Sequence, residues 1–143
     1  MVARSFLRDE HGAAMVELAF ALPILLLVVW GIVDFGRLLV TASGLTNAAR
    51  EGARYGAVLQ APTTTTSTAA IDSVVRSRFA PLGGDSLTNS EISVAFTAGS
   101  PTGVKVTINN YPWKTITPLG GMVRAMASQS LTRSATFRWE WGS

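Results

Sequence analysis

The 143-residue chain has a mass of 15.1 kDa, which suits one small domain with an anchor better than two independent cores. Hydrophobic residues make up 48% of it and charged residues only 15%, and this excess of apolar side chains indicates a membrane segment. The chain has no cysteine, which excludes disulfides, thiolate metal sites and a cysteine nucleophile. Its net charge of +3 comes from scattered basic residues, so the charge does not indicate a nucleic-acid site.

Residues 1–12 form a short polar leader, and residues 13–33 form an apolar run of 21 residues with a single charge. At about 1.5 Å per residue this run reaches about 31 Å, which matches a hydrocarbon core of about 30 Å. A secretory signal peptide is the competing interpretation, but no small-x-small cleavage site closes the run. We therefore expect residues 13–33 to be a retained transmembrane helix. Arg4 and Arg8 in the leader favour a cytoplasmic N-terminus, with the rest of the chain extracytoplasmic.

Glu17 is the one charge in the apolar run. A carboxylate inside a span costs several kcal/mol at mid-membrane and less near an interface, and such residues usually have a partner. Two interpretations remain open: Glu17 reaches the headgroups of the lipid, or another molecule supplies a counter-charge, such as a newly made N-terminus. Pro23 removes one backbone hydrogen bond and should bend the helix.

The helical pattern continues through residues 34–59 as an amphipathic extension of the span. One face is predicted to be polar and solvated, and the opposite face is apolar and mostly small. Small residues let another backbone come close, either that of a partner helix or that of this chain's own domain. The predicted packing residues are Gly36, Ala42, Ala49, Gly52, Ala53 and Gly56. The predicted polar face carries Asp34, Arg37, Thr41, Asn47, Arg50, Glu51 and Arg54.

Residues 60–68 are predicted to be a linker, because Pro62 and a run of threonines have poor helical preference and no apolar period. Residues 69–143 are predicted to form a small α+β domain. It begins with a short amphipathic helix that ends before Pro81.

Two alternating segments, residues 91–99 and 103–111, predict a β-hairpin with its turn at residues 100–103. Residues 111–126 then read as a connection, and residues 128–141 as an imperfect third strand. The predicted fold class is thus α+β, with a long N-terminal helix packed with a short helix and a three-stranded antiparallel sheet. Trp113, Trp139 and Trp141 are expected to serve packing in the core or at an interface, in preference to an adhesive patch.

No constellation in the sequence supports catalysis, a metal or a cofactor. The only histidine, His11, lies in the leader, and the carboxylates are scattered. The Gly83-Gly84 and Gly120-Gly121 pairs follow Pro-Leu and lack a phosphate-binding lysine, so they read as turns. We expect a protein that is not an enzyme.

The segment Gly12-Ala13-Ala14-Met15-Val16-Glu17 before an apolar helix resembles the type IV prepilin pattern. More specifically, the stretch "RDEHGAAMVELAFALPILLLVVWGIVDFGR" with "NAAREGARYGA", and "VKVTINNYPWKTITPLGG" before a strand ending in "RWE", resemble the TadE-like minor pilins, or pseudopilins, of the tight-adherence (Tad/Flp) type IV pilus system. The resemblance implies that a prepilin peptidase cuts after Gly12 and makes Ala13 the new N-terminus. It also implies that Glu17 pairs with the Ala13 ammonium of an adjacent subunit and fixes the axial register.

The resemblance further implies assembly of a Tad pilus for surface adherence through helix packing with other subunits. The implied partners are the other Tad minor pilins, the major Flp pilin, the prepilin peptidase, the inner-membrane assembly platform and the lipid bilayer. The implied location is the inner membrane, with incorporation into a cell-surface pilus. The alternative is a stand-alone signal-anchored extracytoplasmic binding protein, which predicts an intact leader and indifference to Glu17.

Overall fold

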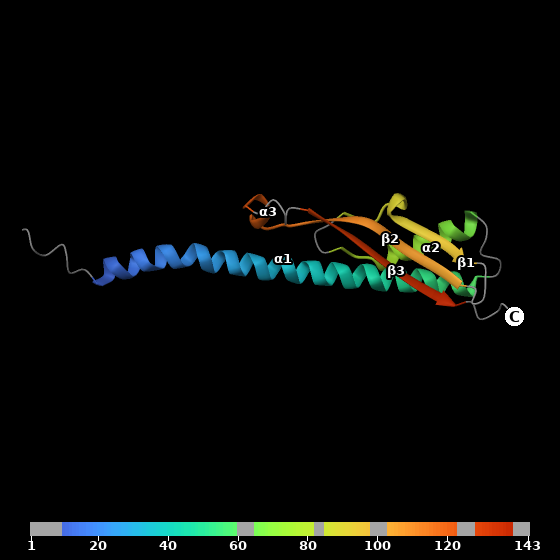
Figure 1. Ribbon diagram of the computed structural model, residues 1–143, viewed down its shortest axis with the longest axis horizontal. Helices are drawn as coiled ribbons and strands as arrows, with labels where there is room; N and C mark the ends of the chain where they lie inside the picture. The colour runs from blue at the N-terminus through green and yellow to red at the C-terminus, as the bar shows by residue number, and fades with distance from the viewer. Residues whose placement is uncertain (1–9, 60–64, 82–84, 98–102, 123–127, 139–143) are drawn as a thin grey trace, which may run out of the picture.

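The computed structural model describes residues 10–59, 65–81, 85–97, 103–122 and 128–138. One long helix, α1 (Glu10–Val58), extends well beyond a small globular part, as Figure 1 shows. The globular part, called the domain below, consists of α2, the sheet and α3, which pack along the C-terminal half of α1. A long helix, a short helix and a three-stranded antiparallel sheet confirm the predicted α+β fold. The elements after α1 are α2 (Thr65–Arg78), the 3-10 turn η1 (Asn89–Glu91), β1 (Ile92–Thr97), β2 (Gly103–Lys114), α3 (Leu119–Met122) and β3 (Ser128–Arg138).

The sheet has the order β1-β2-β3, with both neighbouring pairs antiparallel. Ile92 lies opposite Ile108 and Phe96 opposite Val104, so the predicted hairpin is confirmed. Of its predicted turn, only Gly103 is among the described residues, and it begins β2. The strand β2 runs further than predicted, through Pro112 to Lys114. Because β1 pairs only with residues 103–108, β2 has only β3 as a neighbour at Pro112, where a missing N–H is tolerated.

A β-bulge interrupts the pairing of β2 with β3. Two residues of β2, Asn109 and Asn110, lie opposite Thr132 alone. Asn110 has a φ of 50°, and its backbone N–H donates to the Thr132 hydroxyl at 3.2 Å. An extra residue exchanges the two faces of a strand, because side chains alternate with a period of two. The inner face is therefore carried by Val104, Val106 and Ile108 before the bulge and by Tyr111 and Trp113 after it.

The positive φ at Asn110 gives a stability test. Asparagine and glycine adopt this conformation readily, whereas a β-branched residue does not. We expect Asn110→Val to lower the free energy of unfolding by about 1–2 kcal/mol, and Asn110→Gly to stay within about 0.5 kcal/mol of the wild type. Thermal unfolding in detergent, followed by near-UV circular dichroism, measures both. Equal free energies of unfolding of the two variants would contradict the inference that the backbone at Asn110 disfavours a β-branched residue.

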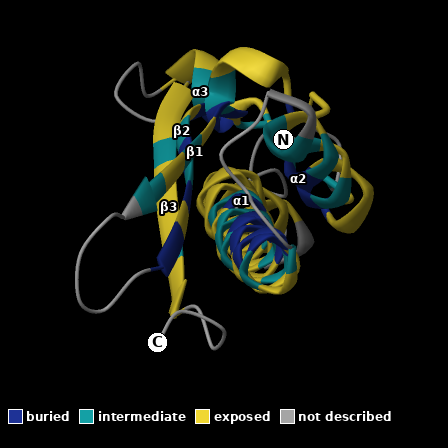
Figure 2. Ribbon diagram, turned by 90° about the vertical axis from the view of Figure 1, so that its right-hand side faces the viewer, coloured by how far each residue is buried: buried dark blue, intermediate teal, exposed yellow. Residues whose placement is uncertain are grey.

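The core lies between α1, α2 and one face of the sheet. In the view along α1 in Figure 2, the sheet lies on one side of this helix and α2 on another. α2 contributes Ile71 and Val75, which lie four residues apart on one face, and Phe79 directly follows the helix. The Phe79 ring meets the Tyr111 ring edge to face at 5.1 Å between centroids, and the Tyr111 hydroxyl donates to the carbonyl of Asp85 at 2.7 Å.

Two further sequence expectations meet the structure here. Residues 60–68 were predicted as a linker, but α2 begins at Thr65, because burial of Ile71, Val75 and Phe79 outweighs the weak helical preference of the residues before them. The strand β3 ends at Arg138 in the described chain, and Trp139 and Trp141 lie outside the described residues.

Candidate functional site

The N-terminal half of α1 carries large apolar side chains that the domain leaves exposed. Met15 and Phe20 are each 75% exposed, and the exposed series continues through Val33. In the described chain, α1 is the one helix that is long and apolar enough to cross a membrane. Because its apolar window is not buried within the structure, the N-terminal half of α1 is a candidate membrane anchor.

The residues of the predicted processing site lie on this exposed half. Gly12 and Ala13 fall in the first turns of α1, because the helix already begins at Glu10. Glu17 is exposed, and it has no hydrogen bond or ion pair with any other described residue. Pro23 lies inside α1, which continues through it as one helix.

The predicted packing residues of α1 differ in burial, and Ala42 is half-buried. Ala49, Gly52, Ala53 and Gly56 are buried against α2 and the sheet of the same chain. Gly36 is exposed, and a Cβ atom built there would meet nothing within 4 Å. The interpretation that the small residues pack on the chain's own domain therefore holds at Ala49, Gly52, Ala53 and Gly56, and these four are not free to face a partner helix.

The closest approach is at the two glycines. A Cβ atom on Gly52 would lie 2.4 Å from Cγ2 of Val75. A Cβ atom on Gly56 would lie 2.9 Å from both Cδ1 of Ile71 and Cγ1 of Val104. Both distances are too short for real atoms, so these glycines let α2 and β2 contact the backbone of α1 directly.

Three residues predicted on the solvated face of α1 instead face the domain. Thr41 is only 5% exposed and Asp34 only 4%. Asp34 Oδ1 accepts a hydrogen bond from the backbone N–H of Ile116 at 3.2 Å, and Oδ2 accepts one from the Thr117 hydroxyl. The prediction that Asp34, Arg37 and Thr41 are solvated is wrong, and the chain from the end of β2 to α3 returns to this level of α1 and covers Asp34 and Arg37.

Arg37 completes this contact. Its Nη1 lies 3.7 Å from Asp34 Oδ1 and donates to the carbonyl of Lys114 at 3.4 Å. Its guanidinium carbon lies 6.0 Å from the centroid of the Trp113 ring, at the outer limit of a cation–π contact. We call Asp34, Arg37, Trp113, Ile116 and Thr117 the junction.

Sequence reasoning missed the junction for a definite reason. Asp34 and Arg37 are three residues apart on one helix, which is a local signal for an ion pair. Their other partners lie 82 and 83 positions from Asp34 and 77 positions from Arg37, and no local pattern predicts contacts at that separation.

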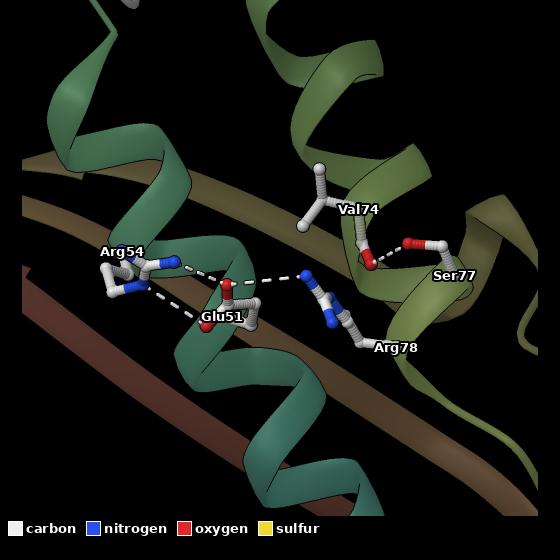
Figure 3. A network of polar contacts seen from close by, with 5 residues as sticks. All are labelled: Glu51, Arg54, Val74, Ser77 and Arg78. Carbon is white, nitrogen blue, oxygen red and sulfur yellow. Dashed lines mark hydrogen bonds and ion pairs between the residues drawn. The ribbon is translucent and has the colours of Figure 1, made fainter.

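Further along α1, a polar network connects α1 to α2, as Figure 3 shows. Arg54 binds Glu51 through two hydrogen bonds of 2.6 and 3.2 Å, and Arg78 of α2 lies 4.0 Å from the same carboxylate. The hydrogen bond from Arg54 is the main reason that the pKa of Glu51 lies below its ordinary value. These groups are exposed to solvent, so we assign the network only a small effect on stability.

In the described residues, no group of three or more His, Cys, Asp or Glu side chains could hold a metal ion. The structure combines three features: the exposed apolar half of α1, the close contact at Gly52 and Gly56, and the buried pair of Asp34 and Arg37. The pair lies at the end of the domain nearest the N-terminal half of α1, which we call the foot of the domain. The glycine contact and the pair serve packing, and the apolar half of α1 is the candidate anchor.

Comparison with known families gives one match. A family model described as TadE-like protein matches residues 12–54, which begin at Gly12 and include Glu17, the apolar run, the junction residues of α1 and Gly52. No curated protein and no solved structure matches the chain.

Proposed function

We propose that this TadE-like chain is a minor pilin, or pseudopilin, that takes part in assembly of a Tad (Flp) type IV pilus for surface adherence. The match over residues 12–54 confirms the TadE-like resemblance and indicates a Tad pilus-associated protein. The observation that carries the finer role is that the matched segment includes the half of α1 that the domain leaves exposed. That half is available to lipid first and to other pilin helices later.

Processing is the first step of the proposed role. A prepilin peptidase removes residues 1–12 and leaves Ala13 as the N-terminus. The proposal places the N-terminus of α1 on the cytoplasmic side of the inner membrane and the domain on the outer side. Arg4 and Arg8 support this orientation.

Glu17 is the residue that the proposal assigns to assembly. An exposed carboxylate on an apolar helix is unfavourable in hydrocarbon, and it finds no partner in the described part of its own chain. An ammonium at Ala13 of an adjacent subunit supplies the missing charge. Pairing the two in a low-dielectric bundle fixes the axial register between neighbours, because a shift along the axis would separate them.

The proposed partners are the other Tad minor pilins, the major Flp pilin and the inner-membrane assembly platform. Since residues 49–56 pack within the chain, contacts with partner helices fall to the outward-facing residues of α1, among them Gly36, Phe35 and Leu39. Phe35 is 60% exposed and Leu39 55%, although both lie beyond the predicted span.

The test uses the full chain expressed with the peptidase and pilins of its own system. We expect intact mass measurement to show a mature chain that begins at Ala13. We expect Glu17→Ala to remain membrane-bound but to lower co-isolation with other pilins by about tenfold, the effect of an ion pair of about 1.4 kcal/mol.

Glu51→Ala is the matched control, because it makes the same change on the same helix in a solvated network, and it should leave co-isolation unchanged. The intact mass of each variant shows whether it is processed like the wild type. An intact leader with no effect of Glu17→Ala would reject the pilin role and favour the signal-anchored binding protein.

A further inference from the structure

A cavity of about 330 Å³ lies at the foot of the domain, where the exposed apolar half of α1 passes into its packed half. Gly31, Phe35 and Leu38 of α1 line one side, and Trp113 of β2 and Leu119 of α3 line the other. Its lining is almost entirely apolar. Its volume falls at the lower end of the range of about 300–1,000 Å³ that is typical of small-molecule pockets.

Trp113 is the largest side chain that lines the cavity. Its side chain is only 6% exposed, and its indole Nε1 is buried with no hydrogen-bond partner in the described part of the chain. Because Nε1 is buried, a ligand in the cavity would meet the apolar ring of Trp113 and not its N–H. The guanidinium of Arg37 lies over the same ring.

The position of the cavity indicates the source of its ligand. Gly31 belongs to the apolar run of residues 13–33, which places the cavity at the end of the membrane anchor. Figure 1 shows α3 and the adjoining ends of β2 and β3 beside this part of α1, so this end of the domain faces the membrane. Two large apolar side chains are exposed at this end: Ile116 is 60% exposed and Met122 67%. Exposed apolar side chains and a tryptophan at one level are typical of the boundary between hydrocarbon and headgroups.

We propose that this cavity binds one acyl chain of a phospholipid from the extracytoplasmic leaflet. The methylenes fill the apolar lining, to which Leu38, Trp113 and Leu119 contribute. The inference depends on α1 crossing the membrane. It does not depend on cleavage after Gly12 or on pilus assembly.

The experiment uses the purified full chain in nanodiscs of phosphatidylethanolamine and phosphatidylglycerol. A small fraction of the phosphatidylethanolamine carries a photoactivated diazirine on one acyl chain, and mass spectrometry maps the crosslinked residues. We expect crosslinks in residues 13–33, which contact bulk lipid, and a second group in residues 113–119, at Trp113, Thr115 and Leu119, which line the cavity.

Two variants on α1 form a matched pair. Gly31→Leu places a side chain in the cavity, where an added Cβ has only an ordinary contact of 4.0 Å with Leu119, so the fold should persist. It should abolish crosslinking to residues 113–119 and leave crosslinking to residues 13–33 unchanged. Gly36→Leu makes the same change at an open site that does not line the cavity, and it should retain both groups of crosslinks.

Three results would overturn the inference. The first is labelling of residues 13–33 without labelling of residues 113–119. The second is equal labelling of residues 113–119 in Gly31→Leu and Gly36→Leu. If labelling is equal and Gly31→Leu also lowers co-isolation with other pilins, the cavity binds a side chain of a partner protein and not a lipid. The third is the absence of labelling in residues 13–33, which would reject the membrane anchor itself, whereas failure of the Glu17 experiment would leave the lipid result intact.

Discussion

Gly52→Leu is expected to disrupt the packing of the domain on α1. An added Cβ atom would already lie 2.4 Å from Cγ2 of Val75, and leucine adds three further carbons at the same place. Overpacking a filled core usually costs about 1–3 kcal/mol and sometimes more, and we expect a loss of at least about 3 kcal/mol here because α2 and β2 both converge on this turn. Thermal unfolding of the full chain in detergent, followed by near-UV circular dichroism, measures the effect.

Gly36→Leu is the control for this prediction. It introduces the same side chain on the same helix where an added Cβ meets nothing within 4 Å, and it should change stability by less than about 0.5 kcal/mol.

Two smaller substitutions test the contact between Gly52 and Val75 itself. Gly52→Ala and Val75→Ala should each destabilise, but the double variant should recover part of the loss, with a coupling of about 1 kcal/mol. If the two losses in the free energy of unfolding simply add, α2 moves away from an added methyl group at Gly52 at little energetic cost.

Asp34→Ala is expected to release the foot of the domain from α1. The change removes the acceptor of the Ile116 N–H and of the Thr117 hydroxyl, and it leaves the guanidinium of Arg37, only 12% exposed, without its carboxylate. Breaking one partner of a buried pair costs about 3–5 kcal/mol, and we expect the lower end of this range because the contacts are only partly buried. Hydrogen exchange of the Ile116 amide reports the local release, and thermal unfolding reports the total loss.

Asp85→Ala is the matched control for Asp34→Ala. Like Asp34, Asp85 faces a basic side chain: its carboxylate lies 3.6 Å from Nζ of Lys114. The Asp85 side chain, however, is 71% exposed. A solvated pair of this kind contributes between about 0 and 1 kcal/mol, so this variant should unfold like the wild type. If the two aspartate variants lose the same stability, the junction does not hold the domain on α1.

The long helix and the hairpin could be predicted because each is specified by a local period. Apolar residues at steps of three and four continue from the span into the domain, and the alternation of Ile92, Val94 and Phe96 meets that of Val104, Val106 and Ile108. Where a pattern repeats within a few residues, propensity and burial agree and the element follows.

The bulge and the junction could not be predicted in the same way. The inward face of β2 changes from even to odd positions at Asn110, so an unbroken alternation assigns Tyr111 and Trp113 to the wrong side. Asp34 and Arg37 appear solvated on a helical projection of α1 alone, since the segment that covers them arrives some 80 positions later. The glycines of α1 illustrate a third case: the sequence indicated close packing but left the neighbour open, and the structure places Gly52 against Val75 of the same chain.

The unbroken course of α1 has a mechanical consequence. The domain is fastened to this helix at two levels, by the glycines at residues 52 and 56 and by Asp34 near its foot, with helix in between. Rotation of the anchor about its own axis therefore turns the domain through the same angle, and each residue inserted between Glu17 and Asp34 would reorient it by about 100°. The number of residues between Glu17 and Asp34 therefore sets the direction in which the sheet faces, about the axis of α1, relative to the carboxylate of Glu17.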